Sequence, residues 1–476
     1  MTDTPAFLAE AEDLLGPRGF TTDPDLMAPW LTDWRRRFTG RALGMASPAS
    51  TQETAALVGL CARHGIAIVP QGGNSGMCGG ATPDKSGEAV LLSMRRMATI
   101  REIDAEAGRA VCDAGVVLQT LHEAADEQGL RLPLTLGGKG SATIGGLVST
   151  NAGGTQVLRH GSMRALVLGL EAVLPDGKVF SALTPLKKDN RGFDLKQLLI
   201  GSEGTLGIVT AATLRLLPAI ADRRVLWAGV ESLPAARRLL VHCEAETGDA
   251  LEGFEVLAQG TLDDVLNHLP DARAPLSGMH PWHVLIELVA ERSKVERLDA
   301  MAEGMLASAL EAGLLADATI AANETQAEAF WQLRDSVAAS QRAKGPAVQH
   351  DISVPVEKMP AFVEEAVPYM ESAWPGTQAI AFGHLGDGNI HFHVIAPRGV
   401  DPEAWYTDEA KAISGQVYDM VTRWGGSISA EHGIGQLKVD ELSRLGDPVA
   451  LAMLRTIKRA LDPQGIMNPG KLLVSE

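Results

Sequence analysis

Three histidines close together in the chain have the type and spacing needed for a metal site. They are His384, His391 and His393, in the segment GHLGDGNIHFHV at residues 383–394. The GDGN in its middle predicts a turn, so His384 would end one strand, and His391 and His393 would lie on one face of the next. A hairpin would bring His384 and His391 side by side. Imidazole suits zinc and other divalent ions of similar character.

A second segment, SAEHGIGQLK at residues 429–438, places Glu431 beside His432 between glycines. Two histidines and one carboxylate would give a three-ligand site with an open position, as a catalytic metal requires. A lone histidine is more often a solvated or hydrogen-bonded structural residue. The clustering, together with the adjacent Glu-His pair, favours metal binding.

Glycine clusters are the other pattern with a chemical meaning. They read QGGNSGMCGG at 71–80, LGGKGSATIGG at 136–146 followed by NAGG, and GSEGTLGIVT at 201–210. Glycine lets the backbone come close to a ligand, and successive N–H groups can enclose an anion such as a pyrophosphate. One such loop could equally be a flexible surface turn. Three in one predicted domain indicate backbone wrapped around a long ligand.

Several other classes of protein are disfavoured. No G-x-G-x-x-G follows a first strand of a βαβ unit, and there is no Walker A loop. With 59 acidic and 42 basic residues the formal charge is −17, which argues against nucleic acid and anionic lipid as partners.

The cellular context can also be predicted. The N-terminal residues lack a signal-peptide pattern, and no apolar run approaches the length of a transmembrane segment. The four cysteines show no C-x-x-C spacing, so a reducing compartment is expected. We expect a cytoplasmic protein, and peripheral association with a membrane partner is left open.

Periodicity predicts the elements that carry the first glycine loop. Ser50 and Glu53 have capping-box spacing ahead of helically spaced apolar residues. The apolar run at 66–69 predicts a strand that opens into the glycine loop. Further strands are expected at 166–174, from 179 after a Pro-Asp-Gly turn, and at 205–217. Residues 1–220 therefore read as one α+β domain.

The rest of the chain predicts a second α+β domain and a tail. Helices are expected at 234–243 and 293–312, and strands at 284–289 and 379–382. We assign residues 221–412 to this second domain, which carries the metal histidines. Residues 413–476 form a helical C-terminal segment, interrupted by the glycine-rich loop that contributes Glu431 and His432.

The three glycine segments together resemble the FAD domain of the vanillyl-alcohol-oxidase type flavoproteins, and the resemblance extends over nearly the whole chain. It implies an α+β fold: an FAD-binding domain, a substrate (cap) domain with an antiparallel sheet, and a C-terminal helical segment. The first loop holds no histidine that could tether flavin, so we expect non-covalent FAD. The implied FAD contacts are Gly72, Gly73, Asn74, Ser75, Gly76, Gly140, Ser141, Thr143, Gly146, Ile208 and Asn468.

GHLGDGNIHFHV, AEHGIGQLK and MNPGK resemble the D-2-hydroxy acid dehydrogenase branch of that family, which acts on substrates such as D-2-hydroxyglutarate and D-lactate. The resemblance implies zinc or a similar ion at His384, His391 and Glu431, with His432 as the catalytic base. It also places Arg334 at the substrate carboxylate.

The expected substrate pocket departs from the branch. Gln349, followed by His350, stands where many relatives carry a lysine. Ala338 stands in the position of a threonine, and His393 in that of an asparagine. We count Gln349, His350 and His393 as substrate-binding candidates. The departures bear on which 2-hydroxy acid is used.

The resulting expectation is a metal-assisted, FAD-dependent oxidation of a small D-2-hydroxy acid of the D-2-hydroxyglutarate, D-lactate or D-malate type to the 2-oxo acid. Electrons would pass to a quinone, an electron-transfer flavoprotein or a cytochrome, and a homodimer is left open. The alternatives are a same-fold oxidase that uses oxygen and a non-catalytic FAD-binding subunit of an oxidase complex. A hydrolytic zinc enzyme is a third alternative, which would lack flavin absorption.

Overall fold

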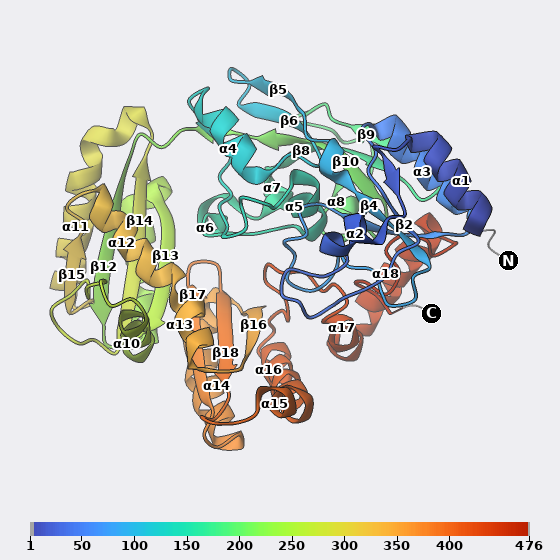
Figure 1. Cartoon of the computed structure of the whole chain (residues 1–476). Helices are drawn as coiled ribbons and strands as arrows, with labels where there is room; N and C mark the ends of the chain where they lie inside the picture. Colours follow the sequence, from blue (N-terminus) through green and yellow to red (C-terminus); the bar gives the residue numbers. More distant parts are fainter. Residues whose placement is uncertain (1–3, 475–476) are drawn as a thin grey trace. The chain divides into compact units, whose positions relative to one another are not determined.

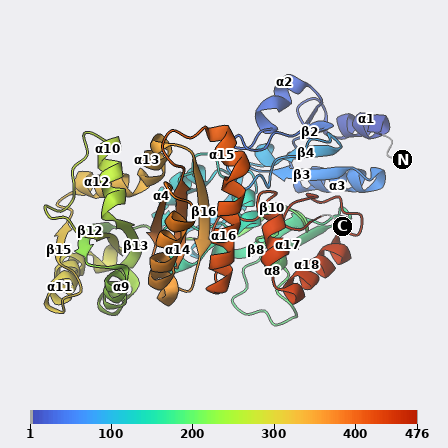
Figure 2. The same cartoon turned by 90° about the horizontal axis from the view of Figure 1, so that it is seen from below.

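The computed structural model describes residues 4–474, apart from the side chains of residues 293 and 294, and these residues form two compact units. Unit 1 contains the chain up to Gly154, His160–Ala219, and the chain from Glu431 onward. Unit 2 contains Thr155–Arg159 and Ile220–Ala430. Figure 1 and Figure 2 show the elements of each unit, coloured along the sequence.

Unit 1 contains a small mixed sheet of order β1-β2-β4-β3, in which β4 pairs in parallel with both β2 and β3. The strands are β1 (Phe20–Thr21), β2 (Gly44–Ala46), β3 (Ala67–Gln71) and β4 (Ala89–Ser93). Helix α3 (Thr51–His64) begins where the sequence predicts, because Ser50 Oγ accepts the N–H of Glu53 at 3.1 Å. It ends at Gly65, whose φ is 65°. The predicted order of helix, strand and glycine loop is confirmed.

A second sheet of unit 1 is antiparallel, with order β5-β6-β10-β8-β9. Its strands are β5 (Ile100–Asp104), β6 (Arg109–Asp113), β8 (Val167–Val173), β9 (Val179–Ala182) and β10 (Ile208–Arg215). The predicted turn between β8 and β9 is present, since the Leu174 N–H donates to Lys178 O at 2.8 Å. A short pair, β7 (Leu130–Arg131) and β11 (Leu217–Pro218), lies apart from this sheet.

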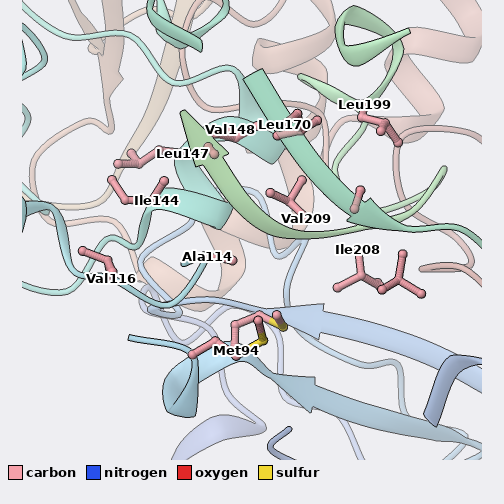
Figure 3. Close-up of a cluster of buried hydrophobic side chains, with 14 of the residues drawn as sticks. Met94, Ala114, Val116, Ile144, Leu147, Val148, Leu170, Leu199, Ile208 and Val209 are labelled. Atoms are coloured by element: carbon pink, nitrogen blue, oxygen red, sulfur yellow. The ribbon is translucent and has the colours of Figure 1, made fainter. Parts of the chain in front are cut away.

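The core of unit 1 draws on both sheets and on the helices between them. Figure 3 shows Met94, which follows β4, in one cluster with Ile208 and Val209 of β10 and Leu147 of α5. The other helices of unit 1 are α1 (Thr4–Leu15), α2 (Pro24–Met27), α4 (Leu118–Asp126), α5 (Ile144–Thr150), α7 (Met163–Leu166) and α8 (Lys196–Leu199). α6 (Val157–His160) falls where the chain makes its short passage into unit 2.

The last part of the chain completes unit 1. After α17 (Val439–Leu445) and α18 (Pro448–Leu461), the chain runs beside β3. There the Ile68 N–H donates to Ile466 O at 2.7 Å, and the Asn468 N–H donates to Ile68 O at 2.8 Å. Residues 413–430 belong to unit 2, and the chain from Glu431 onward belongs to unit 1.

Unit 2 is built on a seven-stranded sheet of order β15-β12-β14-β13-β17-β18-β16. Every pairing in it is antiparallel, which confirms the expected antiparallel sheet. The strands are β12 (Asp222–Val230), β13 (Leu251–Ala258), β14 (Trp282–Ala290), β15 (Asp317–Ile320), β16 (Ala347–Ser353), β17 (Gln378–His384) and β18 (Asn389–Ile395).

Helices cover the unit 2 sheet in two layers, seen on either side of it in Figure 2. One layer holds α9 (Leu233–Thr247), α11 (Leu298–Glu311), α14 (Met359–Ala373) and α16 (Ala410–Arg423), with α15 (Pro402–Asp408) against α16. The other holds α10 (Gln259–His268), α12 (Glu324–Asp335) and α13 (Val337–Lys344). Among residues 4–474, no helix combines the length and the apolar character that crossing a bilayer requires.

Candidate active-site regions of the two units

A cavity of about 510 Å³ lies within unit 1, which is a size typical of small-molecule and cofactor sites. All three glycine segments line it, together with Met94 beside β4. Glu431 and His432 line the same cavity. The structure therefore brings together sequence motifs that lie more than 200 residues apart.

Most of the predicted FAD residues lie in the cavity wall. The ones that line it are Gly72, Gly73, Asn74, Ser75, Gly76, Thr143, Gly146 and Ile208. Gly140, Ser141 and Asn468 are not among the lining residues. Asn468 instead contacts two residues of the cavity wall, because its Nδ2 donates to Gly80 O at 3.0 Å and to Glu203 O at 2.7 Å.

The wall has the properties that a dinucleotide requires. A Cβ added to Gly73 would lie 1.6 Å from Ser141 O, and one added to Gly72 would lie 2.2 Å from Thr143 Oγ1, so only glycine fits. Gln71 Oε1 and Thr143 Oγ1 are buried and have no hydrogen-bond partner within the described chain. Buried polar atoms are rarely left in this state, and a polar ligand in the cavity would satisfy them.

The loop that follows His432 is held by a buried glutamate that our sequence analysis missed. The Glu203 carboxylate accepts the N–H of Ile434 at 2.8 Å and that of Gly435 at 2.7 Å. Burial raises the pKa of Glu203, and these two donors oppose the rise. A charged residue inside GSEGTLG was the available signal, but we read that motif only for its glycines.

The same loop is also tied to the first glycine loop. Cys78 Sγ lies 3.3 Å from Gly433 O, to which it donates, and the Gln436 N–H donates to Cys78 O at 3.0 Å. The Gln436 side-chain amide donates to Gly79 O at 2.8 Å. Glu431 and His432 thus precede a backbone segment that two glycine loops hold in place.

The predicted histidine hairpin is present in unit 2. Strands β17 and β18 pair Phe382 with His391 and His384 with Asn389, so both histidines lie on one face of the sheet. Their ring centroids are 5.4 Å apart. The expectation that the hairpin brings His384 and His391 side by side is confirmed.

Glu255 on β13 orients this pair. It is 1% exposed, and its Oε1 accepts a hydrogen bond from His384 Nδ1 at 2.5 Å. Arg334 on α12 donates from Nε to Glu255 Oε2 at 2.8 Å, and its Nη2 lies 3.3 Å from His384 Nε2. Burial acts to raise the pKa of Glu255, but the charges of Arg334 and His384 outweigh it and hold the pKa well below its usual range.

This arrangement places two imidazoles close enough together to act as ligands of one ion. With the Nδ1 proton of His384 donated to Glu255, Nε2 is the ring nitrogen left for a metal, the arrangement usual in metal-ligating histidines. Burial, followed by the charge of Arg334, lowers the pKa of His391 well below its usual value. Metal ligation needs deprotonated imidazole, so the environment favours the required form.

The three substrate-pocket candidates of unit 2 do not all lie together. Gln349 on β16 pairs with His393 on β18, so both share the face of His391. His393 Nδ1 is hydrogen-bonded to Gln341 Oε1 on α13. His350 lies on the opposite face, where its Nδ1 donates to Phe392 O at 2.9 Å and its Nε2 lies 3.0 Å from Ser414 Oγ. Neighbouring strand residues point to opposite faces, so Gln349 and His350 cannot both line one pocket.

Family models match two stretches of the chain. Residues 42–182 match an FAD binding domain, and residues 220–472 match the C-terminal domain of FAD linked oxidases.

Curated relatives match over nearly the whole chain. D-2-hydroxyglutarate dehydrogenase, mitochondrial, of Arabidopsis thaliana is 37% identical, with 97% of this chain and 80% of the relative covered. The Bos taurus protein of that name is also 37% identical, over 96% and 81%. D-2-hydroxyglutarate dehydrogenase of Xanthomonas citri pv. viticola is 35% identical, over 95% and 93%.

Two solved structures of similar fold match this chain at low sequence identity. p-Cresol methylhydroxylase with substrate bound gives a TM-score of 0.75 at 17% identity, covering 98% of this chain and 96% of the other. 4-Ethylphenol oxidase from Gulosibacter chungangensis gives a TM-score of 0.73 at 18% identity, covering 100% and 98%. At such identities the likeness shows the fold.

Proposed function

This chain belongs to the FAD-linked oxidase family that includes the D-2-hydroxyglutarate dehydrogenases, and on that premise we propose how its residues carry out the reaction. The protein has the vanillyl-alcohol-oxidase type fold and is an FAD-dependent dehydrogenase that oxidises a D-2-hydroxy acid. The proposal adds non-covalent FAD, a divalent cation at His384, His391 and Glu431, and His432 as the base.

The observation that carries the proposal is the position of His432 in the wall of the glycine-lined cavity of unit 1. FAD, when bound, supplies the acceptor for the hydride that leaves C2 of the substrate. The hydroxyl on C2 must also lose its proton. A neutral His432 accepts that proton on a ring nitrogen, and the bonds from Glu203 and Cys78 hold the backbone that follows it.

The cation site is supported by the two adjacent imidazoles of unit 2 and by the carboxylate that orients one of them. The third ligand, Glu431, follows Ala430, whose N–H donates to Asp351 O at 3.4 Å. Asp351 is the cross-strand partner of His391. Glu431 is joined to Ala430 by one peptide bond, and this keeps Glu431 within one residue of the bond to the β16–β18 strand pair. A divalent cation would stabilise negative charge developing on the substrate oxygen.

Arg334 is the proposed partner of the substrate carboxylate. A guanidinium can bind a carboxylate through two parallel hydrogen bonds. Its bond to the buried Glu255 fixes its orientation next to His384. The substrate carboxylate would thereby be held beside the cation site.

The central experiment is anaerobic mixing of the purified holoenzyme with D-lactate, D-malate or D-2-hydroxyglutarate, and with their L enantiomers. We expect at least one D acid to bleach the oxidised flavin absorption, and the L acids to leave it unchanged. Bleaching by L acids alone, or by none of the acids, would refute the proposal.

Variants separate the roles of the residues. His432→Ala should retain flavin and lose reduction by substrate, whereas His384→Ala should lose bound metal. His122→Ala is the control for the first, because this half-buried histidine of unit 1 bonds Leu134 O and does not line the cavity. Denaturation should release all flavin into the filtrate if FAD is non-covalent.

Two further proposals concern the cellular setting, namely a cytoplasmic location and an acceptor that is a quinone, an electron-transfer flavoprotein or a cytochrome. Adding each class of acceptor to the reduced enzyme, and measuring the rate of flavin reoxidation against that with oxygen, would identify the acceptor and test the oxidase alternative.

A further inference from the structure

We infer that the substrate carries an uncharged group beyond C2, and that Gln341, Gln349 and His393 contact this group. The group is either a hydrogen-bond acceptor or a short alkyl group. The inference rests on the proposed function and specifies its substrate class. It concerns the face of the unit 2 sheet that bears His384 and His391, with α12 and α13 over it.

The three residues lie at a distance from the metal histidines that suits the end of a small substrate. His393 is two residues beyond His391 on β18, so their Cα atoms are about 7 Å apart. Gln349 pairs with His393 across β16 and β18. A substrate with its C2 hydroxyl near His391 would therefore extend its remaining carbons toward this pair.

Two amide groups in this region lack acceptors. Gln341 is 0% exposed, and its Oε1 is already engaged by His393 Nδ1. Gln341 Nε2 and Gln349 Nε2 are both buried and have no hydrogen-bond partner within the described chain. Buried donors of this kind are normally satisfied, so their arrangement favours a ligand that supplies oxygen acceptors.

Near His393, the described part of this face offers no second cation for a second carboxylate. Arg223 on β12 shares the face but is bound to Glu287, Glu324 and Glu328. Strands β13, β16, β17 and β18 contain no lysine or arginine. Arg334 on α12 is engaged by Glu255, while Lys344 on α13 binds Asp264 and Gln378, and Arg342 is exposed.

Apart from Arg334 and the proposed cation, the charged side chains nearest this pair are acidic. Glu255 and Asp351 are both at most 2% exposed, and Asp351 shares the face through its pairing with His391. A distal substrate carboxylate would be desolvated among these acids and paired with neutral amides, which is unfavourable. D-2-hydroxyglutarate, for which the relatives are named, carries such a distal carboxylate.

The test compares substrates that carry a distal charge with substrates that lack it. The values of kcat/KM are measured for D-2-hydroxyglutarate and its 5-amide, and for D-malate and D-2-hydroxybutyrate. We expect the neutral member of each pair to be preferred at least tenfold. Calorimetric binding of 2-oxoglutarate and of 2-oxobutyrate to the oxidised holoenzyme, which needs no turnover, should show the same order.

Gln349→Lys supplies the missing cation and should reverse the preference toward D-2-hydroxyglutarate by tenfold or more. Gln332→Lys is the matched control, because Gln332 is an exposed residue of α12 and the added charge stays in solvent. Should Gln349→Lys fail to fold, Gln349→Ala replaces it. In that variant, kcat/KM should fall by a larger factor for the neutral substrates than for the dicarboxylates.

The outcomes are distinguishable from failure of the proposed function. If no D-2-hydroxy acid reduces the flavin, the proposed function is refuted. If D acids reduce it but the dicarboxylates are equal or better substrates of the unmodified protein, the inference is overturned and the function stands. An unchanged preference in folded Gln349→Lys would also overturn the role of Gln349.

Discussion

The carboxylate of Glu203 accepts the backbone N–H of Gly435 across a sequence separation of 232 residues, at a distance of 2.7 Å. The neighbouring N–H of Ile434 occupies the other carboxylate oxygen. A Cβ at Gly433 would lie 2.9 Å from Glu203 Oε1, so the approach depends on glycine. One buried side chain in the third glycine segment therefore fixes the backbone that follows His432.

Replacing Glu203 by glutamine should lower kcat by a larger factor than it lowers the flavin content of the purified protein. An amide has one acceptor oxygen, so one of the two N–H donors would lose its partner, at a cost of about 1.5–3 kcal/mol. We expect kcat to fall about tenfold or more through displacement of His432. Steady-state kinetics and flavin content measure the two effects. Glu171→Gln is the control, since Glu171 bonds Thr51 and Arg101 and does not line the cavity; an equal fall in kcat there would contradict the assignment.

Alanine at Gly73 should abolish flavin retention. The added Cβ would meet Ser141 O at 1.6 Å, which is backbone and cannot move without shifting the loop. The flavin-to-protein absorbance ratio of the purified variant measures the effect. Gly59→Ala in α3 adds a Cβ with nothing within 4 Å and should keep flavin while raising helix stability by up to about 1 kcal/mol. Full flavin occupancy in Gly73→Ala would show that the loop does not hold the cofactor.

Glu255→Gln should weaken metal binding about 10–100-fold, because the carboxylate that orients His384 would be lost. Competition with a chromophoric chelator measures the affinity directly. Glu287→Gln provides a comparison: this buried glutamate of the same sheet lies on β14 and pairs with Arg223 of β12. The proposal predicts unchanged affinity in that variant, and a similar loss in both would indicate a general effect on the sheet.

The stability of unit 2 should fall in mild acid through His283. Burial, and then the charge of His280, lower its pKa to about 4, and its Nδ1 accepts a hydrogen bond from Trp227 Nε1 at 3.0 Å. Since the unfolded pKa is about 6.5, the unfolded chain binds more protons between these values. The contribution of neutral His283 to the stability is fully present above about pH 6.5 and is lost as the pH falls toward 4. The loss is about 2 kcal/mol at pH 5.

Denaturant unfolding at pH 7 and pH 5 tests this sign. His283→Asn keeps an acceptor for Trp227 and removes the titrating group. Between pH 7 and pH 5, the unfolding free energy of the unmodified protein should fall by about 2 kcal/mol more than that of His283→Asn. An identical change in both proteins would assign the acid sensitivity to other groups.

Local patterns predicted the elements well where they depend on neighbouring residues. The Ser50 cap, the β8–β9 turn and the histidine hairpin all follow from side chains close in sequence, and the structure has each of them. The hairpin also predicted that His384 and His391 lie side by side, because strand alternation fixes which residues share a face.

Contacts between residues far apart in the sequence could not be predicted from sequence patterns. Glu255 meets His384 across 129 residues, and Glu203 meets Gly435 across 232, with no local periodicity to indicate either. The placement of His350 was missed for a simpler reason. It was grouped with Gln349 by adjacency, whereas adjacent strand residues face opposite ways.

The pairing of residues 466–468 with β3 has a consequence for how the protein is made. The backbone partner of β3 in this pairing comes after Ala430 in the chain. All of unit 2 must therefore leave the ribosome before unit 1 can complete its fold. Translation proceeds at roughly 5–20 residues per second. During that interval the nascent N-terminal sheet exposes an unpaired strand edge, and chaperones or early flavin capture would have their greatest effect on yield at this stage.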